Sequence, residues 1–282
     1  MTNLWFTEKW SKDTRFSIKV KTHLYSEKTP FQQIDFFNSE EYGNFFTLDG
    51  FIMVTEKDEF IYHDMITHVP MGTNPKIKKV LVIGAGDGGT VRELTKYDHI
   101  EKIDMVEIDE RVVLLCEKYL PITACKLRDK RVNLYFQDGL EFVKDSKEIY
   151  DLIIVDSTDP ISVGEGLFTE NFYKNCFRIL SEEGILVNQH ESPFYENFKV
   201  EMVKAHQKLK NIFPIATVYQ IHQPTYASGH WMLGFASKKY DPILNHNPEQ
   251  WESLNIKTKY YNSNIHKGAF ALPNYVLDIL NK

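Results

Sequence analysis

Cysteine is scarce in this chain of 282 residues, and its arrangement argues against two classes of protein. The three cysteines, Cys116, Cys125 and Cys176, are odd in number, widely spaced and form no Cys-x-x-Cys pair. A disulfide-stabilised scaffold and a structural zinc site both need paired, closely spaced cysteines. The histidines also lack the spacing that is typical of a metal site, so the sequence predicts no metal.

Basic residues and long apolar runs are lacking as well. Lys and Arg number 33 against 39 Asp and Glu, which gives a formal net charge of -6. Nucleic acids and anionic membranes bind surfaces with excess positive charge, so neither partner is expected, whereas cationic substrates suit the charge. The N-terminus has no signal-peptide pattern, and no apolar stretch is long enough to cross a bilayer. We therefore expect a cytoplasmic protein.

The first part of the chain has the patterns of β-strands. Apolar and polar residues alternate over Phe16–Leu24, and Phe31–Phe37 is a second expected strand. Asp49-Gly50 joins the apolar runs Asn44–Leu48 and Phe51–Val54, which predicts a hairpin because Asp-Gly readily adopts the positive backbone angles of a tight turn. Residues 1–57 are therefore predicted to form a small antiparallel β domain.

A helix is predicted next, over Asp58–Val69, because its apolar residues fall on one face and Pro70 follows where a helix should stop. With the linker up to residue 74 it should bridge two domains. From Lys79 onward, short apolar strands alternate with amphipathic helices, which is typical of a parallel sheet covered by helices on both faces. The expected strands are Val80–Ile83, Ile103–Glu107, Val132–Phe136, Leu152–Val155 and Gly184–Val187, and the expected helices include Glu110–Tyr119, Thr169–Leu180 and Glu196–Leu209.

Two further strands, at about Ile215–Ile221 and Gly229–Ala236, follow in quick succession near the end of this domain, which spans residues 75–282. A closing hairpin of this kind is typical of the adenosylmethionine-dependent version of the fold. The predicted fold class is α/β, with a doubly wound, mostly parallel seven-stranded sheet of the S-adenosylmethionine-dependent methyltransferase type. A small N-terminal antiparallel β domain precedes this α/β domain in the predicted fold.

Strand ends carry the residues that indicate a ligand. The loop Gly84–Gly89 runs from the first strand of this domain into a helix at Thr90, where glycines let the backbone approach a ligand, although a merely tight turn would use the same residues. Glu107 closes the second strand, where a carboxylate can accept from both ribose hydroxyls. Asp138-Gly139 ends the third, so its carboxylate could accept from an adenine amino group, or it is an ordinary turn. Together they predict an adenine nucleoside.

Asp87 separates this loop from a pyrophosphate site. A carboxylate there repels phosphate by roughly 4 kcal/mol at about 4 Å in an effective dielectric near 20, and it would repel the carboxylate of ordinary adenosylmethionine equally. A donor with an ammonium group and no carboxylate, such as decarboxylated S-adenosylmethionine, is favoured. The alternative is an aspartate that caps the helix or lies in solvent.

Two more carboxylates, Asp156 and Asp159, follow the fourth strand at the same edge of the sheet, although each could be an ordinary turn residue. With Asp87 and Glu107 they would bring four acids together, which is costly unless cations or protons offset them. A sulfonium and the ammonium groups of a polyamine are such cations.

Taken in order, these residues resemble the spermidine synthases, a family of polyamine aminopropyltransferases. The resemblance is carried by Gly84–Thr90, Val106–Asp109, Asp138-Gly139, Asp156–Pro160 and Leu167–Thr169, and it extends from Tyr62–Met65 to Ala269–Pro273. It implies transfer of the aminopropyl group of decarboxylated S-adenosylmethionine to putrescine, giving spermidine and methylthioadenosine without a cofactor. It also implies a homodimer, or a homotetramer, built partly through the N-terminal domain.

The resemblance further implies a role for each site residue. Asp156 would be the proton acceptor. The nucleoside donor would be held by Gln32, Asp87, Glu107, Asp138 and Gly139, and the polyamine by Tyr62, His63, Asp87, Asp156, Asp159 and Tyr226. Considered without the resemblance, the two tyrosines could be core aromatics and His63 a histidine on a helix surface.

Three departures from the family pattern lie near these residues. Ala85 replaces a glycine, which should be harmless if Ala85 has a negative φ, and Ser162-Val163 and Ala227 stand in loops that border the substrate. The rival hypotheses are an S-adenosylmethionine-dependent N-methyltransferase acting on a diamine, a nicotinamide oxidoreductase, which Asp87 opposes, and a catalytically silent polyamine-binding protein.

Overall fold

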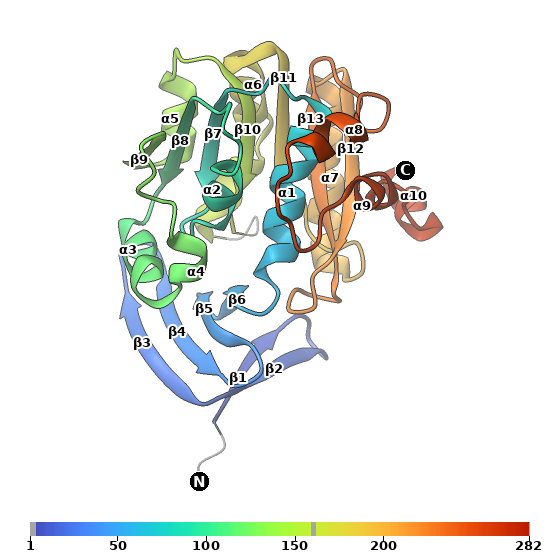
Figure 1. The fold of residues 1–282 in the computed structure, drawn as a ribbon. Coiled ribbons are helices and arrows are strands. Elements are labelled where there is room, and N and C mark those ends of the chain that lie inside the picture. The colour runs from blue at the N-terminus through green and yellow to red at the C-terminus, as the bar shows by residue number, and fades with distance from the viewer. Residues whose placement is uncertain (1–3, 159–161, 282) are drawn as a thin grey trace.

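The computed structural model describes residues 4–158 and 162–281, which form a small β domain beside a larger α/β domain (Figure 1). In the small domain a two-stranded antiparallel sheet lies next to a four-stranded antiparallel sheet. The first sheet consists of β1 (Leu4–Lys9) and β2 (Arg15–Val20), and the second of β3 (Thr22–Lys28), β4 (Gln33–Ser39), β5 (Gly43–Leu48) and β6 (Phe51–Thr55).

The prediction of a single strand over Phe16–Leu24 is wrong. The chain bends at Lys21, and β2 and β3 belong to different sheets. Ile18 and Val20 pack in a small separate core, whereas Leu24 packs against the main core of the protein. The alternation of apolar and polar residues continues through the bend, because each strand buries one of its faces. β1 was not predicted, since most of its residues are exposed.

Helix α1 (Glu59–Thr73) joins the two domains and is buried over nearly its whole length. The predicted stop at Pro70 is wrong, because the helix continues through Pro70 to Thr73. Proline removes one backbone hydrogen bond from a helix. The last turn is held by the Asn74 N–H, which donates to the Pro70 carbonyl at 2.9 Å, and by the Thr73 hydroxyl, which donates to the Val69 carbonyl at 2.8 Å. Packing on all sides therefore overrides local propensity here.

The large domain contains the predicted seven-stranded sheet, in the order β12-β13-β11-β10-β7-β8-β9. The five strands from β11 to β9 are parallel, and β13 is antiparallel to both of its neighbours. This arrangement confirms the predicted fold class. The strands are β7 (Lys79–Gly84), β8 (Lys102–Glu107), β9 (Val132–Phe136), β10 (Tyr150–Asp156), β11 (Leu180–Gln189), β12 (Ile215–His222) and β13 (His230–Ser237).

Helices cover both faces of the sheet, as alternate strand residues require. In β7, Val80 and Val82 pack on the face covered by α1 and α2, whereas Leu81 and Ile83 pack on the face covered by α6. The helices are α2 (Gly89–Leu94), α3 (Glu110–Tyr119), α4 (Pro121–Ala124), α5 (Gly139–Asp145), α6 (Glu170–Ile179), α7 (Glu196–Ile212), α8 (Pro248–Ser253), α9 (Ser263–Ala269) and α10 (Asn274–Leu280), with a 3-10 helix at Ser162–Phe168. Within the described ranges, none of the helices has both the length and the apolar character needed to span a membrane.

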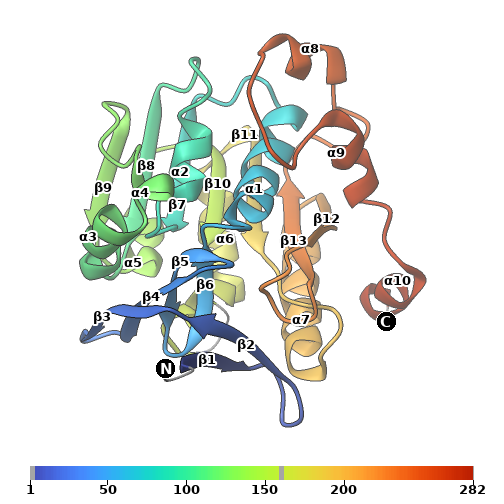
Figure 2. The same cartoon turned by 60° about the horizontal axis from the view of Figure 1, so that its bottom comes forward.

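The strand order places the functional edge of the sheet. β7 lies between β8 and β10, so the order in which successive strands are added to the sheet reverses at this point, and a crevice opens at the carboxyl ends of the strands. Gly84 and Asp156, the last residues of β7 and β10, are paired in the sheet. The strands of the N-terminal domain lie next to this edge (Figure 2).

Candidate active site

A cavity of about 1270 Å³, partly open to solvent, lies at this edge and is lined by residues of both domains. Pockets for small ligands occur preferentially at such switch points. Nine predicted site residues line the cavity, namely Gln32, Tyr62, His63, Asp87, Glu107, Asp138, Gly139, Asp156 and Tyr226. The tenth, Asp159, lies outside the described residues.

The glycine loop owes its shape to the strand beside it. Gly84 has a φ of +84°, and a Cβ there would lie 2.1 Å from the Asp156 carbonyl oxygen. Ala85 has a φ of +62°, so the condition of a negative φ is not met. An L-residue in this region costs roughly 1–2 kcal/mol. The Ala85 N–H donates to the Asp156 carbonyl at 2.8 Å, and this bond holds the loop against β10.

Glu107 and Asp138 end neighbouring strands on one side of the cavity. The Glu107 carboxylate accepts from the Asp109 N–H at 3.0 Å, and Asp138 caps α5 by accepting from the Leu140 N–H at 2.8 Å. Burial raises the pKa of Glu107 to about 7, and the nearby Asp109 charge adds to the effect. Gln32 reaches this side from the N-terminal domain, where its amide donates to Asp109 at 3.2 Å.

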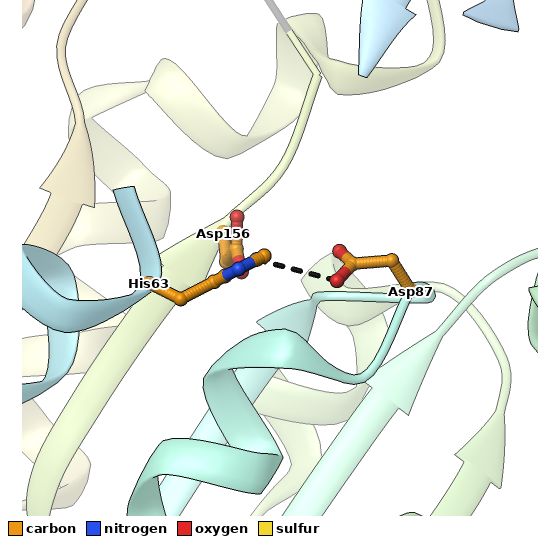
Figure 3. A group of neighbouring side chains, drawn as sticks. All are labelled: His63, Asp87 and Asp156. Atoms are coloured by element: carbon orange, nitrogen blue, oxygen red, sulfur yellow. Dashed lines mark ion pairs between the residues drawn. The ribbon is translucent and has the colours of Figure 1, made fainter. Parts of the chain in front are cut away.

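His63 lies between the carboxylates of Glu59 and Asp87. Figure 3 shows its ion pair with Asp87. Its Nδ1 is 2.7 Å from Glu59 and its Nε2 is 3.2 Å from Asp87. Burial lowers the pKa of His63, but the charges and hydrogen bonds of Asp87 and Glu59 outweigh it and raise the pKa well above its usual value. The side chain is only 2% exposed, so the alternative of a surface histidine is wrong.

Asp87 lies in the loop just before α2. Its carboxylate accepts at 2.8 Å from the N–H of Gly89, the first residue of α2, although the N-cap residue of this helix is Gly88. It also lines the cavity and pairs with His63. The bond from Gly89 therefore holds the carboxylate at the cavity.

Asp156 is the central carboxylate of the cavity. The Thr90 hydroxyl donates to it at 2.6 Å, and the Tyr62 hydroxyl is a second hydrogen-bond partner. Burial and the charge of Asp87 raise the pKa of Asp156, while His63 and the two hydroxyls oppose the rise. A carboxylate with a raised pKa is a stronger base, and this suits it to accept a proton near neutral pH.

The two predicted tyrosines pack against each other in the cavity wall. The rings of Tyr62 and Tyr226 are 5.9 Å apart in an edge-to-face arrangement. Tyr226 also donates from its hydroxyl to the Met53 carbonyl at 2.8 Å, which ties it to the N-terminal domain. Both tyrosines pack against the core as well, so the core and cavity interpretations hold together.

The acids are thus offset partly from within the protein, by the His63 cation and by the raised proton affinity of Asp156 and Glu107. The ligand atoms of His63, Asp87 and Asp156 lie within 4.8 Å of one another, a spacing that could also hold a metal ion. Because both ring nitrogens of His63 face carboxylates, a metal would have to break one of these hydrogen bonds.

Sequence reasoning missed Glu8, Glu59 and Arg92. Glu8, in β1, lines the cavity and accepts from the Ile52 N–H at 3.2 Å. Its strand has no strong pattern, so no local signal indicates it. Glu59 stands four residues before His63, which places the two on one helix face. That spacing was a usable signal.

The fold and these side chains define a class: a Rossmann-like α/β protein with an acidic cavity at the carboxyl edge of its sheet. Comparison with known proteins defines the family. Residues 59–247 match the spermine/spermidine synthase domain, and residues 4–56 match the spermidine synthase tetramerisation domain. The chain therefore belongs to the spermine/spermidine synthase family, and it is an aminopropyl-transferring enzyme, as predicted.

Individual relatives agree over the full length. The chain is 67% identical to the polyamine aminopropyltransferase of Clostridium acetobutylicum, covering 100% of this chain and 99% of the relative. It is 64% identical to that of Alkaliphilus oremlandii, covering 99% and 98%.

Solved structures show the same fold. A spermidine synthase in complex with the transition-state analogue AdoDATO superposes with a TM-score of 0.96 at 42% identity, covering 99% of this chain and 95% of that one. The spermidine synthase of Thermotoga maritima gives a TM-score of 0.93 at 40% identity, covering 99% and 94%.

The pKa of Glu107 predicts how stability depends on pH. Because burial raises this pKa from 4.5 to about 7, the folded protein binds a proton that the unfolded chain has released. The free energy of unfolding contributed by Glu107 should therefore fall as pH rises from about 4.5 to about 7. In urea titrations, Glu107→Gln should be more stable than the wild type by about 3 kcal/mol at pH 8 and by about 1 kcal/mol or less at pH 5.

Glu110→Gln, at an exposed position in α3, is the matched control and should show no such change between the two pH values. An equal difference between Glu107→Gln and the wild type at pH 5 and pH 8 would contradict the raised pKa.

Proposed function

We propose that this enzyme transfers the aminopropyl group of decarboxylated S-adenosylmethionine to putrescine, producing spermidine and methylthioadenosine. The observation that carries the proposal is the convergence of Asp87 and Asp156 beside His63 at the carboxyl edge of the sheet. Carboxylates at this place favour a cationic donor and a cationic acceptor, and they disfavour a donor that carries its own carboxylate. The names of the relatives support the same conclusion.

The nucleoside half of the donor would lie along the strand ends that carry Glu107 and Asp138. Glu107 would accept from the ribose hydroxyls, and Asp138 from the adenine amino group. Gly139 packs closely against the wall of the cavity, because a Cβ there would lie 2.7 Å from the Ile83 side chain. Gln32 would close this end from the N-terminal domain.

The amine would occupy the part of the cavity that Tyr62 and Tyr226 line together. Tyr62, Asp156 and Tyr226 would surround the attacking nitrogen, and Asp87 and Asp159 would supply negative charge at its borders. His63 would border the subsite and act on the amine through its pairing with Asp87. Glu8 offers a further carboxylate from the N-terminal domain for the far ammonium group of a diamine.

In the proposed reaction the attacking ammonium group first loses a proton. Its pKa is near 10.4, so exposing the lone pair at pH 7 costs roughly 4 to 5 kcal/mol. Asp156 accepts the proton. The nitrogen lone pair then forms a bond to the carbon next to the sulfonium, and the C–S bond breaks with its electron pair going to sulfur. The products are a neutral thioether and the lengthened amine.

Product analysis tests the proposal directly. The protein is incubated with putrescine and either decarboxylated S-adenosylmethionine or S-adenosylmethionine, and the products are identified by mass spectrometry. We expect spermidine and methylthioadenosine from the decarboxylated donor and little turnover of the other. A methylated diamine and S-adenosylhomocysteine would instead support the N-methyltransferase and overturn the proposal.

Asp156→Asn tests the proton acceptor. An amide cannot accept the proton, so turnover should fall by about 10²–10⁴, while calorimetry should show that methylthioadenosine still binds. Asp151→Asn is the control, because Asp151 lies on the same strand far from the cavity and accepts from the N–H groups of Lys78 and Lys79. Near-normal turnover of Asp156→Asn would remove Asp156 from this role.

We further propose that the chain assembles as an oligomer, a homodimer or a homotetramer, through its N-terminal domain. The match of residues 4–56 to the spermidine synthase tetramerisation domain supports this proposal, and this domain exposes Leu4 and Trp5 of β1 to 49% and 54%. Sedimentation should give two or four times the chain mass of 33.0 kDa. Trp5→Ser should weaken the assembly, whereas Leu244→Ser, at a residue 83% exposed near α8, should not. A monomeric wild type would contradict the proposal.

A further inference from the structure

A chain of buried ion pairs leads from helix α2 to the cavity. The Arg92 guanidinium donates to both oxygens of Glu59, at 3.0 and 2.8 Å. Glu59 in turn contacts His63 Nδ1 at 2.7 Å, and His63 Nε2 contacts Asp87 at 3.2 Å. The proposed reaction assigns no task to Arg92 or Glu59, although burying such charges is costly unless they are paired this closely.

We infer that Glu59, held by Arg92, is a positioning residue for the reaction, because it fixes His63 as an imidazolium that directs Nε2–H to Asp87 beside Asp156. This inference rests on the proposed role of Asp156 as the proton acceptor.

The hydrogen-bond chemistry of the imidazole supports this state. An ionised carboxylate only accepts, so a histidine between two carboxylates must donate from both ring nitrogens, which only the protonated ring can do. Glu59 is suited to remain ionised: burial raises its pKa, but His63 and Arg92 overcome the rise and lower it to about 2.

The ring is also held sterically. A Cβ on Gly89 would lie 2.2 Å from His63 Cε1, so the ring packs directly against the first turn of α2. Glu59 and Gly89 therefore fix the ring from two sides, and the Nε2–H has one direction in which to point. A histidine without the Glu59 contact would retain only Asp87 as its partner.

The charged and titratable groups that face His63 come from each element packed around it. They are Glu59 and Tyr62 from α1, Asp87 from the glycine loop, Asp156 from β10 and, behind Glu59, Arg92 from α2. The His63 cation lowers the pKa of Asp156 against the effects of burial and Asp87. Loss of the Glu59 charge would weaken the His63 cation, and the pKa of Asp156 would then rise.

The chain offers a matched control in Glu93. It is buried to the same extent as Glu59, with 1% of its side chain exposed, and it accepts from the same Arg92 at 2.9 Å. Its histidine partner is His68, at 2.9 Å, which lies one turn further along α1 and does not line the cavity. Glu59→Gln and Glu93→Gln therefore remove the same charge from the same arginine, but only one of them affects His63.

The experiment measures kcat/KM for aminopropyl transfer between pH 5.5 and 9 for the wild type and both variants. We expect Glu59→Gln to lower kcat/KM at pH 7 by about 10-fold or more and to move the acidic limb of the profile upward by about 1 pH unit. Glu93→Gln should lower thermal stability yet keep the position of the acidic limb. An unmoved limb in Glu59→Gln, or equal shifts in both variants, would overturn the inference.

A second measurement needs no variant. The ¹⁵N chemical shifts of the His63 ring in the wild-type protein should report a doubly protonated imidazolium at pH 7, and a neutral ring would overturn the inference even if Glu59→Gln failed to fold. The wild-type assay separates the two possible failures. Absence of aminopropyl transfer by the wild type would overturn the proposed function, whereas transfer by a wild type with a neutral His63 ring would overturn only this inference.

Discussion

The site depends on one electrostatic constraint: several carboxylates are brought out of water to the same edge of a sheet. Such a cluster is stable only if protons or cations accompany it. The protein supplies one cation itself, at His63, and holds it with Glu59 and Asp87. Burial and neighbouring carboxylates raise the pKa values of Asp156 and Glu107, so a bound cation would stabilise the ionised forms of both groups. Binding of cationic substrates would therefore relieve an imbalance that folding creates.

The two-domain arrangement serves to keep these clustered carboxylates away from water. The sheet edge presents the acids, but it leaves them open to water, which weakens electrostatic interactions. Gln32, Glu8 and the carbonyl of Met53, which receives the Tyr226 hydroxyl, all come from the N-terminal domain. Helix α1 carries Tyr62 and His63 between the two domains, and the burial of both residues fixes their side chains. The cavity is thus a product of the interface rather than of either domain alone.

Much of this could be predicted from the sequence, because strand periodicity and the acidic residues at strand ends are local signals. The alternation from Lys79 onward predicted the sheet, and the positions of Glu107, Asp138 and Asp156 at strand ends predicted the cavity wall. The failures arose where packing overrides local preference. Pro70 continues a helix that is buried on all sides, and Ala85 adopts a positive φ because its N–H bonds to β10.

The short contact between Gly84 and the main chain of Asp156 has a consequence for how this site can change. The loop that would face the donor and the carboxylate that would take the proton share a backbone hydrogen bond and a contact that leaves no room for a Cβ. A substitution that changes the backbone of the loop would also displace Asp156. A change in the loop would therefore alter donor preference and reactivity together. Substitutions in the N-terminal domain, which lines the other side of the cavity, can change the donor without moving Asp156.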